Sequence, residues 1–64
     1  MNDEIFNMSM RKFLKQVGVT SQQQLEKVAA TMPEGTSSMK TKMVLTVTGT
    51  DFVHEVEGTI DLVE

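Results

Sequence analysis

The sequence predicts an α+β fold in which two N-terminal helices form a helical hairpin packed on a C-terminal antiparallel β-hairpin. Before Pro33, apolar residues recur every three or four positions, as on one face of a helix. From Met39 onward they alternate with polar residues, as in a half-buried strand. The chain has only 64 residues, so we expect a single domain over residues 1–64.

The first helix is predicted over residues 3–17. Asn2 can cap its first turn, because an asparagine side chain accepts hydrogen bonds from the free amides there. Gly18 is expected to end this helix, since helix ends favour a glycine in the left-handed conformation. One face of the helix collects the apolar residues Phe6, Met10, Phe13 and Val17.

The second helix is predicted over residues 21–31, followed by a polar linker at 33–38. Thr20 and Gln23 have the spacing of a capping box, in which each side chain bonds the backbone amide of the other residue. Pro33 disfavours helical geometry in the residue before it, so this helix should end just ahead of the linker.

Two strands are predicted, at 40–48 and 52–62, and they form a hairpin. Odd positions are apolar in the first strand and even positions are apolar in the second. The loop can hold two residues, at 50–51, or four residues beginning at Thr48. Both loops leave the same residues on the same face, so the alternation does not choose between them.

Composition argues against several kinds of site. The chain has no cysteine and one histidine, so we expect no disulfide, no metal site and no cofactor. Residues 35–38 lack the lysine of a phosphate-binding loop. No serine in the sequence has a base positioned to activate it, so we expect no catalytic residue and no enzyme activity. The acidic start and the lack of a long apolar run predict a cytoplasmic protein without a membrane span.

Four segments carry a resemblance to a known family. They are residues 2–15 (NDEIFNMSMRKFLK), 17–22 (VGVTSQ), 45–49 (LTVTG) and 57–60 (EGTI). Together they resemble a family of short bacterial proteins of unknown function. The resemblance implies the same helix-and-hairpin architecture and a bacterial, cytosolic origin. It brings no activity, cofactor or catalytic residue with it.

Nucleic-acid binding is the alternative interpretation. The two predicted helices and the turn at Gly18 resemble a helix-turn-helix, and the β-hairpin could then be the wing of a winged-helix domain. Residues 51–64, however, carry five acidic residues and no lysine or arginine. Phosphate binding needs clustered cations, so nucleic acid is an unfavoured partner.

A protein–protein interaction module is therefore the predicted function. A two-stranded sheet leaves both strands as edges, so the first strand can pair with a second copy and form a homodimer. His54 could sense pH at an interface or could simply pack at the rim of the core. The cations of the first helix could contact an acidic protein partner, as yet unknown, or serve only solubility. The candidate interaction residues are Met43, Val44, Leu45, Val47, His54, Arg11, Lys12 and Lys15.

Overall fold

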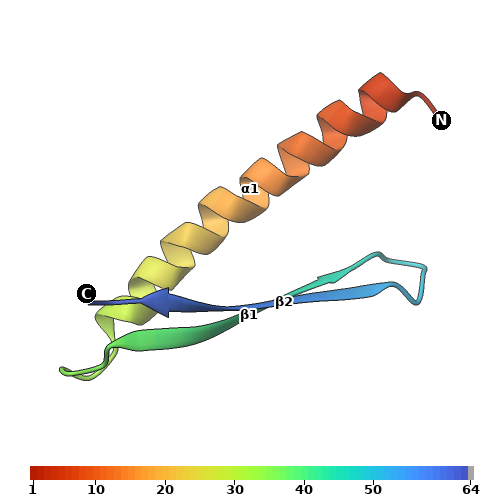
Figure 1. The fold of residues 1–64 in the computed structure, drawn as a ribbon. Coiled ribbons are helices and arrows are strands. Elements are labelled where there is room, and N and C mark those ends of the chain that lie inside the picture. Colours follow the sequence, from red (N-terminus) through yellow and green to blue (C-terminus); the bar gives the residue numbers. More distant parts are fainter. Residues whose placement is uncertain (64) are drawn as a thin grey trace. The chain divides into compact units, whose positions relative to one another are not determined.

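The computed structural model describes residues 1–63, which form one helix and one β-hairpin (Figure 1). Helix α1 spans Asp3–Ala30, strand β1 spans Ser38–Thr46 and strand β2 spans Val53–Asp61. The helix belongs to one compact unit and the hairpin to another, with the boundary between Met32 and Pro33. The predicted α+β fold with a C-terminal antiparallel hairpin is confirmed. The predicted packing of the helical half of the chain on the hairpin stays a prediction.

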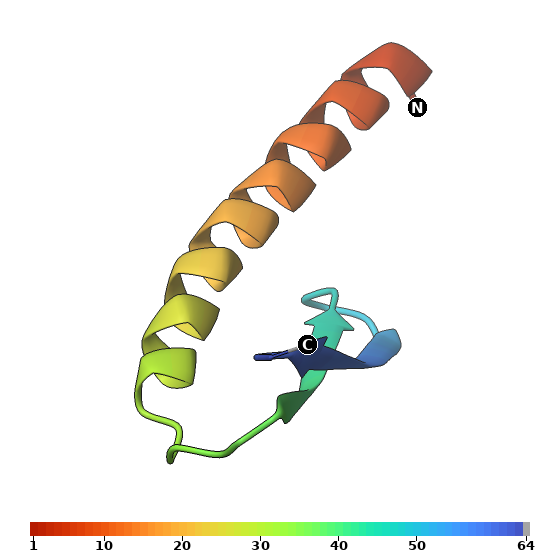
Figure 2. The ribbon, with the colours of Figure 1, turned by 60° about the vertical axis from the view of Figure 1, so that its left-hand side comes forward.

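The prediction of two helices, at 3–17 and 21–31, is wrong, because α1 runs through Gly18 without a break (Figure 2). The Thr20 hydroxyl does not cap a second helix; it donates to the Gln16 carbonyl at 2.8 Å, as threonine does inside a helix. A glycine in a helix interior costs only about 1 kcal/mol relative to alanine. A break would instead create two new helix ends, each with roughly four backbone groups lacking partners.

Both ends of α1 are capped by local hydrogen bonds. The Asn2 side chain accepts from the amides of Glu4 and Ile5 at 3.0 and 3.2 Å, which confirms the predicted N-terminal cap. At the other end, the Thr31 hydroxyl donates to the Val28 carbonyl at 2.7 Å. The helix therefore ends before Pro33, as the sequence indicates.

β1 and β2 form a two-stranded antiparallel sheet in which Leu45 lies opposite His54 and Met43 lies opposite Val56. This is the register of the four-residue loop. The two-residue loop would have paired Leu45 with Val56 and is not formed. Because both loops keep the same faces, the predicted division into an apolar and a polar face holds in the observed register.

Glycine decides where the hairpin turns. The Thr50 amide donates to the Val47 carbonyl at 3.1 Å, and Gly49 has a φ of 84°, a conformation that glycine adopts without strain. The Thr50 hydroxyl donates to the Val47 carbonyl at 2.8 Å and accepts from the Phe52 amide at 3.2 Å. The turn therefore occupies residues 47–50, so β1 ends two residues earlier than predicted.

Neither unit encloses a core of its own. No residue of α1 is buried, and Met39, 6% exposed, is the one buried residue in the part of the chain that the structure describes. An isolated helix and an isolated two-stranded sheet are both marginal in water. Each unit by itself therefore gains little stability from burial of apolar side chains.

Candidate functional site

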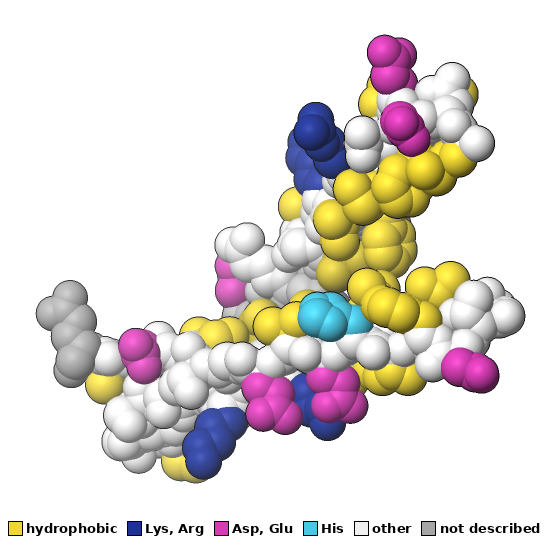
Figure 3. Space-filling view, turned by 45° about the vertical axis from the view of Figure 1, so that its right-hand side comes forward, with side chains coloured by type: hydrophobic (Ala, Val, Ile, Leu, Met, Phe, Trp, Pro, Cys, Tyr) yellow, Lys and Arg dark blue, Asp and Glu magenta, His cyan; other side chains and the backbone are white. Residues whose placement is uncertain are grey.

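One face of the hairpin is apolar, and we call it the hairpin apolar face. Figure 3 shows hydrophobic side chains on both sides of the single histidine, with most of the hairpin's charged side chains on its other side. Opposite each other on this face, Met43 and Val56 are 42% and 54% exposed. The face thus offers apolar surface to a partner. Its members are Met39, Thr41, Met43, Leu45, His54, Val56, Gly58 and Ile60.

The middle of the hairpin apolar face is a notch. Gly58 lies opposite Thr41, so two small residues face each other between the Met43·Val56 and Met39·Ile60 pairs. A Cβ atom added at Gly58 would meet nothing within 4 Å. The notch lets the backbone of a covering element approach this sheet more closely than at the larger pairs on either side.

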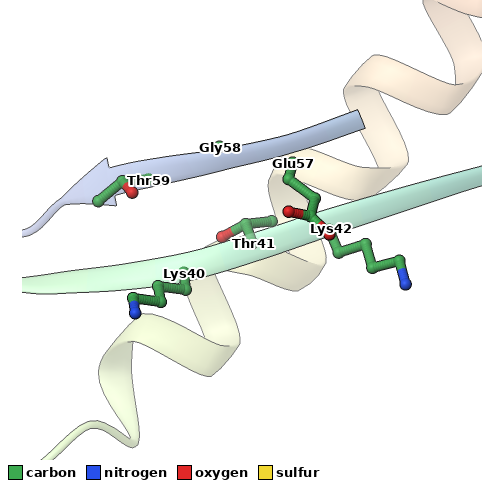
Figure 4. Close-up of a pocket in the computed structure, with 6 residues that line it drawn as sticks. All are labelled: Lys40, Thr41, Lys42, Glu57, Gly58 and Thr59. Carbon is green, nitrogen blue, oxygen red and sulfur yellow. The ribbon is translucent and has the colours of Figure 1, made fainter. Parts of the chain in front are cut away.

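The opposite face of the hairpin carries charges of both signs. Lys42 forms an ion pair with Glu55 at 3.4 Å, and both side chains are about half exposed. An open hollow on the hairpin is lined by residues of both strands, including Lys40, Glu57 and Thr59 (Figure 4). The ammonium groups of Lys40 and Lys42 point in different directions, so they do not converge on one anion. This arrangement is typical of a solvated face.

The outer edge of β1 is free in the described part of the chain, where the sheet has two strands. The Leu62 amide donates to the Ser37 carbonyl at 2.9 Å, one pair beyond the strands. Since hydrogen-bonded and non-bonded pairs alternate, odd residues of β1 bond β2, and even residues direct their amide and carbonyl groups to the free edge. These even residues are Ser38, Lys40, Lys42, Val44 and Thr46.

The ligating side chains of the described residues are dispersed. Among residues 1–63, no three histidine, aspartate or glutamate side chains come close enough to hold a metal ion. His54 has Leu45 as its cross-strand neighbour on the hairpin apolar face. The hairpin also presents the backbone edge of β1 and the hairpin apolar face, which are features that a binding partner can contact.

Comparison with protein families identifies the family of this chain. The family described as "Family of unknown function (DUF6494)" matches residues 1–63. The chain belongs to this family. No curated protein and no solved structure matches it. Membership in DUF6494 confirms the resemblance to a family of unknown function, while bacterial origin stays a prediction.

α1 is also too polar to be a membrane span: no helix in the described residues of this DUF6494 chain has the apolar length to cross a bilayer. The cytoplasmic location stays a prediction.

The structure brings some of the predicted interaction residues together and separates others. Met43, Leu45 and His54 share the hairpin apolar face. Val44 lies on the charged face opposite Glu55, with its backbone at the free edge. Val47 lies outside β1, in the turn. The three predicted cations, Arg11, Lys12 and Lys15, all lie on α1 in the other unit.

Two features of the site were missed by the sequence reasoning. The notch at Gly58 and Thr41 depends on the register, which the alternation of residues left open. The second feature is the length of the apolar side of α1, which continues past Gly18 to Leu25 and Val28. The signal for it was present, because apolar residues keep helical spacing on both sides of Gly18.

Proposed function

We propose that this chain is a non-enzymatic protein–protein interaction module that self-associates through its β-hairpin. The observation that carries the proposal is the free edge of β1, with outward backbone groups at five successive even positions. Such an edge is a template for another strand. A second copy of β1 would satisfy these groups and extend the marginal two-stranded sheet to four strands.

An antiparallel pair of β1 strands centred on Met43 fits the side chains. In this register Lys42 of one copy lies opposite Val44 of the other. A centre at Lys42 would instead place two lysines face to face, which is unfavourable. The Met43 centre also keeps the odd residues of both copies on one side of the sheet, so the two hairpin apolar faces join into one.

Lys42, the lysine at the centre of β1, does not prevent this pairing. Lysine on an edge strand often guards against association. Here Lys42 is drawn to Glu55 of its own hairpin at 3.4 Å, and its side chain lies on the charged face rather than along the edge. The charge of Lys42 is therefore partly neutralised by Glu55 within each copy, which weakens its effect against association.

The winged-helix alternative has lost its main support. It required a turn at Gly18 and a separate second helix to enter the major groove. Since α1 is continuous through Gly18, no such turn exists, and β2 presents Glu55 and Glu57 rather than cations. We therefore put forward no nucleic-acid function.

The test uses the full chain and two opposite substitutions at one edge position. Sedimentation equilibrium of the unsubstituted protein should show a dimer at concentrations up to about 1 mM, whereas a folded monomer throughout that range refutes the proposal. Val44→Lys should weaken the dimer and Val44→Glu should tighten it, because each new charge lies opposite Lys42 of the other copy. With two such pairs per dimer, each shift should be between about twofold and thirtyfold in the dissociation constant.

The two variants carry their own control within the hairpin. Val44 lies opposite Glu55 in the same chain, so Val44→Lys should stabilise the isolated hairpin while Val44→Glu destabilises it. Association and monomer stability must therefore change in opposite directions. Equal shifts of the dissociation constant in both variants would refute the Met43 register.

A further inference from the structure

The continuous α1 carries an apolar stripe that is symmetric about its own middle. We propose that α1 pairs side by side and antiparallel with α1 of a second copy, about a two-fold axis between residues 15 and 16. This contact is additional to the hairpin edge and rests on different residues. Six positions form what we call the α1 stripe: Phe6, Met10, Leu14, Val17, Ser21 and Leu25.

The symmetry lies in the spacing of the stripe. Its successive steps are 4, 4, 3, 4 and 4 residues, which is the same sequence of steps from either end. In an antiparallel pair with this axis, two residues from different copies that lie at the same height along the helices have numbers that add up to 31. Phe6 meets Leu25 of the other copy, and Leu14 near the centre meets Val17. Every level of the stripe thus finds a stripe residue opposite, as an isologous interface requires.

The stripe also stays on one side of the helix. At 3.6 residues per turn its six positions fall within an arc of about 100°. Positions 6 and 17, 10 and 21, and 14 and 25 are each eleven residues apart, and an eleven-residue repeat has about 3.67 residues per turn. This value is close to that of a straight helix, so two copies of α1 can stay in contact over their length with little supercoiling.

The exposed apolar area of the stripe approaches what a stable pair buries. Phe6 is 48% exposed, Leu14 is 51% exposed and Phe13, beside the stripe, is 52% exposed. With about 200 Å² for an aromatic side chain, the stripe and its apolar neighbours expose on the order of 600 Å² per copy. A stable interface buries about 800 Å² per partner, so the stripe supplies most of what a dimer needs.

Charges on α1 favour the antiparallel direction. A parallel pair would place Asp3 and Glu4 of both copies together at one end, and would do the same for the cluster of Arg11, Lys12 and Lys15. In the antiparallel pair Glu4 lies at the level of Lys27, and Arg11 at the level of Thr20. Repulsion between the acidic ends and between the two copies of Arg11 is therefore relieved, although the two Lys15 residues stay at nearly the same level, and the antiparallel orientation is favoured over the parallel one.

Spin-label distances in the full chain test this pairing. The chain has no cysteine, so single substitutions outside the stripe give one label per copy. Two copies of a label are separated along the axis by about 2 Å at Lys15→Cys, about 22 Å at Met8→Cys and about 34 Å at Glu4→Cys, in addition to the lateral spacing. Gln23→Cys must match Met8→Cys, and Lys27→Cys must match Glu4→Cys, because each pair of positions sums to 31.

The possible results separate this inference from the hairpin proposal. Distances that rise on both sides of residues 15 and 16, with equal values for matched sites, support the antiparallel helix pair. Short distances at every site would show a parallel pair and overturn the inference. A dimer whose distances follow neither pattern overturns it too, while leaving association through β1 in place. A monomer without dipolar coupling overturns both.

A second measurement uses the one polar residue of the stripe. Ser21 is at the level of Met10 of the other copy, so Ser21→Leu should lower the dissociation constant by about ten- to a hundredfold through burial of two added side chains. Ser9→Leu, on α1 but outside the stripe, is the matched control and should leave the constant unchanged. Equal effects of the two substitutions would overturn the inference.

Discussion

Replacing Gly18 by alanine tests whether α1 is one helix or two. Within a continuous helix, Gly18→Ala removes the conformational entropy cost of glycine and should stabilise the protein by about 1 kcal/mol. A Cβ atom at this position meets nothing within 4 Å, and Gly18 does not have a positive φ, so neither a clash nor backbone strain offsets the gain. For a chain of this size the midpoint of thermal unfolding should rise by about 4–8 °C.

The sign of the change is the decisive observation. If Gly18 ended a first helix in the left-handed conformation, alanine there would cost about 1–2 kcal/mol instead. Gly49→Ala is the matched control, because Gly49 has a φ of 84° and should show this loss. Unfolding followed by circular dichroism at 222 nm measures both variants. A lower midpoint for Gly18→Ala would refute the continuous helix.

Two further predictions concern the end of α1 and the charged face of the hairpin. Asn2→Ala removes the side chain that accepts from two amides and should cost about 1 kcal/mol in thermal or urea unfolding, whereas Asn7→Ala, inside the helix, should not destabilise it. Glu55→Gln breaks the 3.4 Å ion pair with Lys42, and should cost less than about 1 kcal/mol because both groups are half exposed. That loss should vanish near 1 M salt, and a loss that persists there would contradict a screened surface pair.

The local pattern of the sequence determined much of this protein. The change from helical spacing to alternation predicted a helix followed by a hairpin, because each period reflects the geometry of its own backbone. The Asn2 cap and the residues of the hairpin apolar face followed from the same rules. Of the candidate interaction residues, Met43, Leu45 and His54 were placed on one face by parity alone.

The three-dimensional structure decided the continuity of α1 and the register of the hairpin. At Gly18, the glycine and the capping-box spacing that follows it each favour a helix break by about 1 kcal/mol. The helix ends that a break creates cost a similar amount of free energy, so spacing alone could not predict which effect is larger. Parity left two hairpin loops open, and the structure selects the one in which Gly49 supplies the positive φ. The continuity of α1 creates the unbroken α1 stripe, and the hairpin register creates the Gly58 notch. Each feature depends on how two segments of the chain align, and the residues within one segment do not determine that alignment.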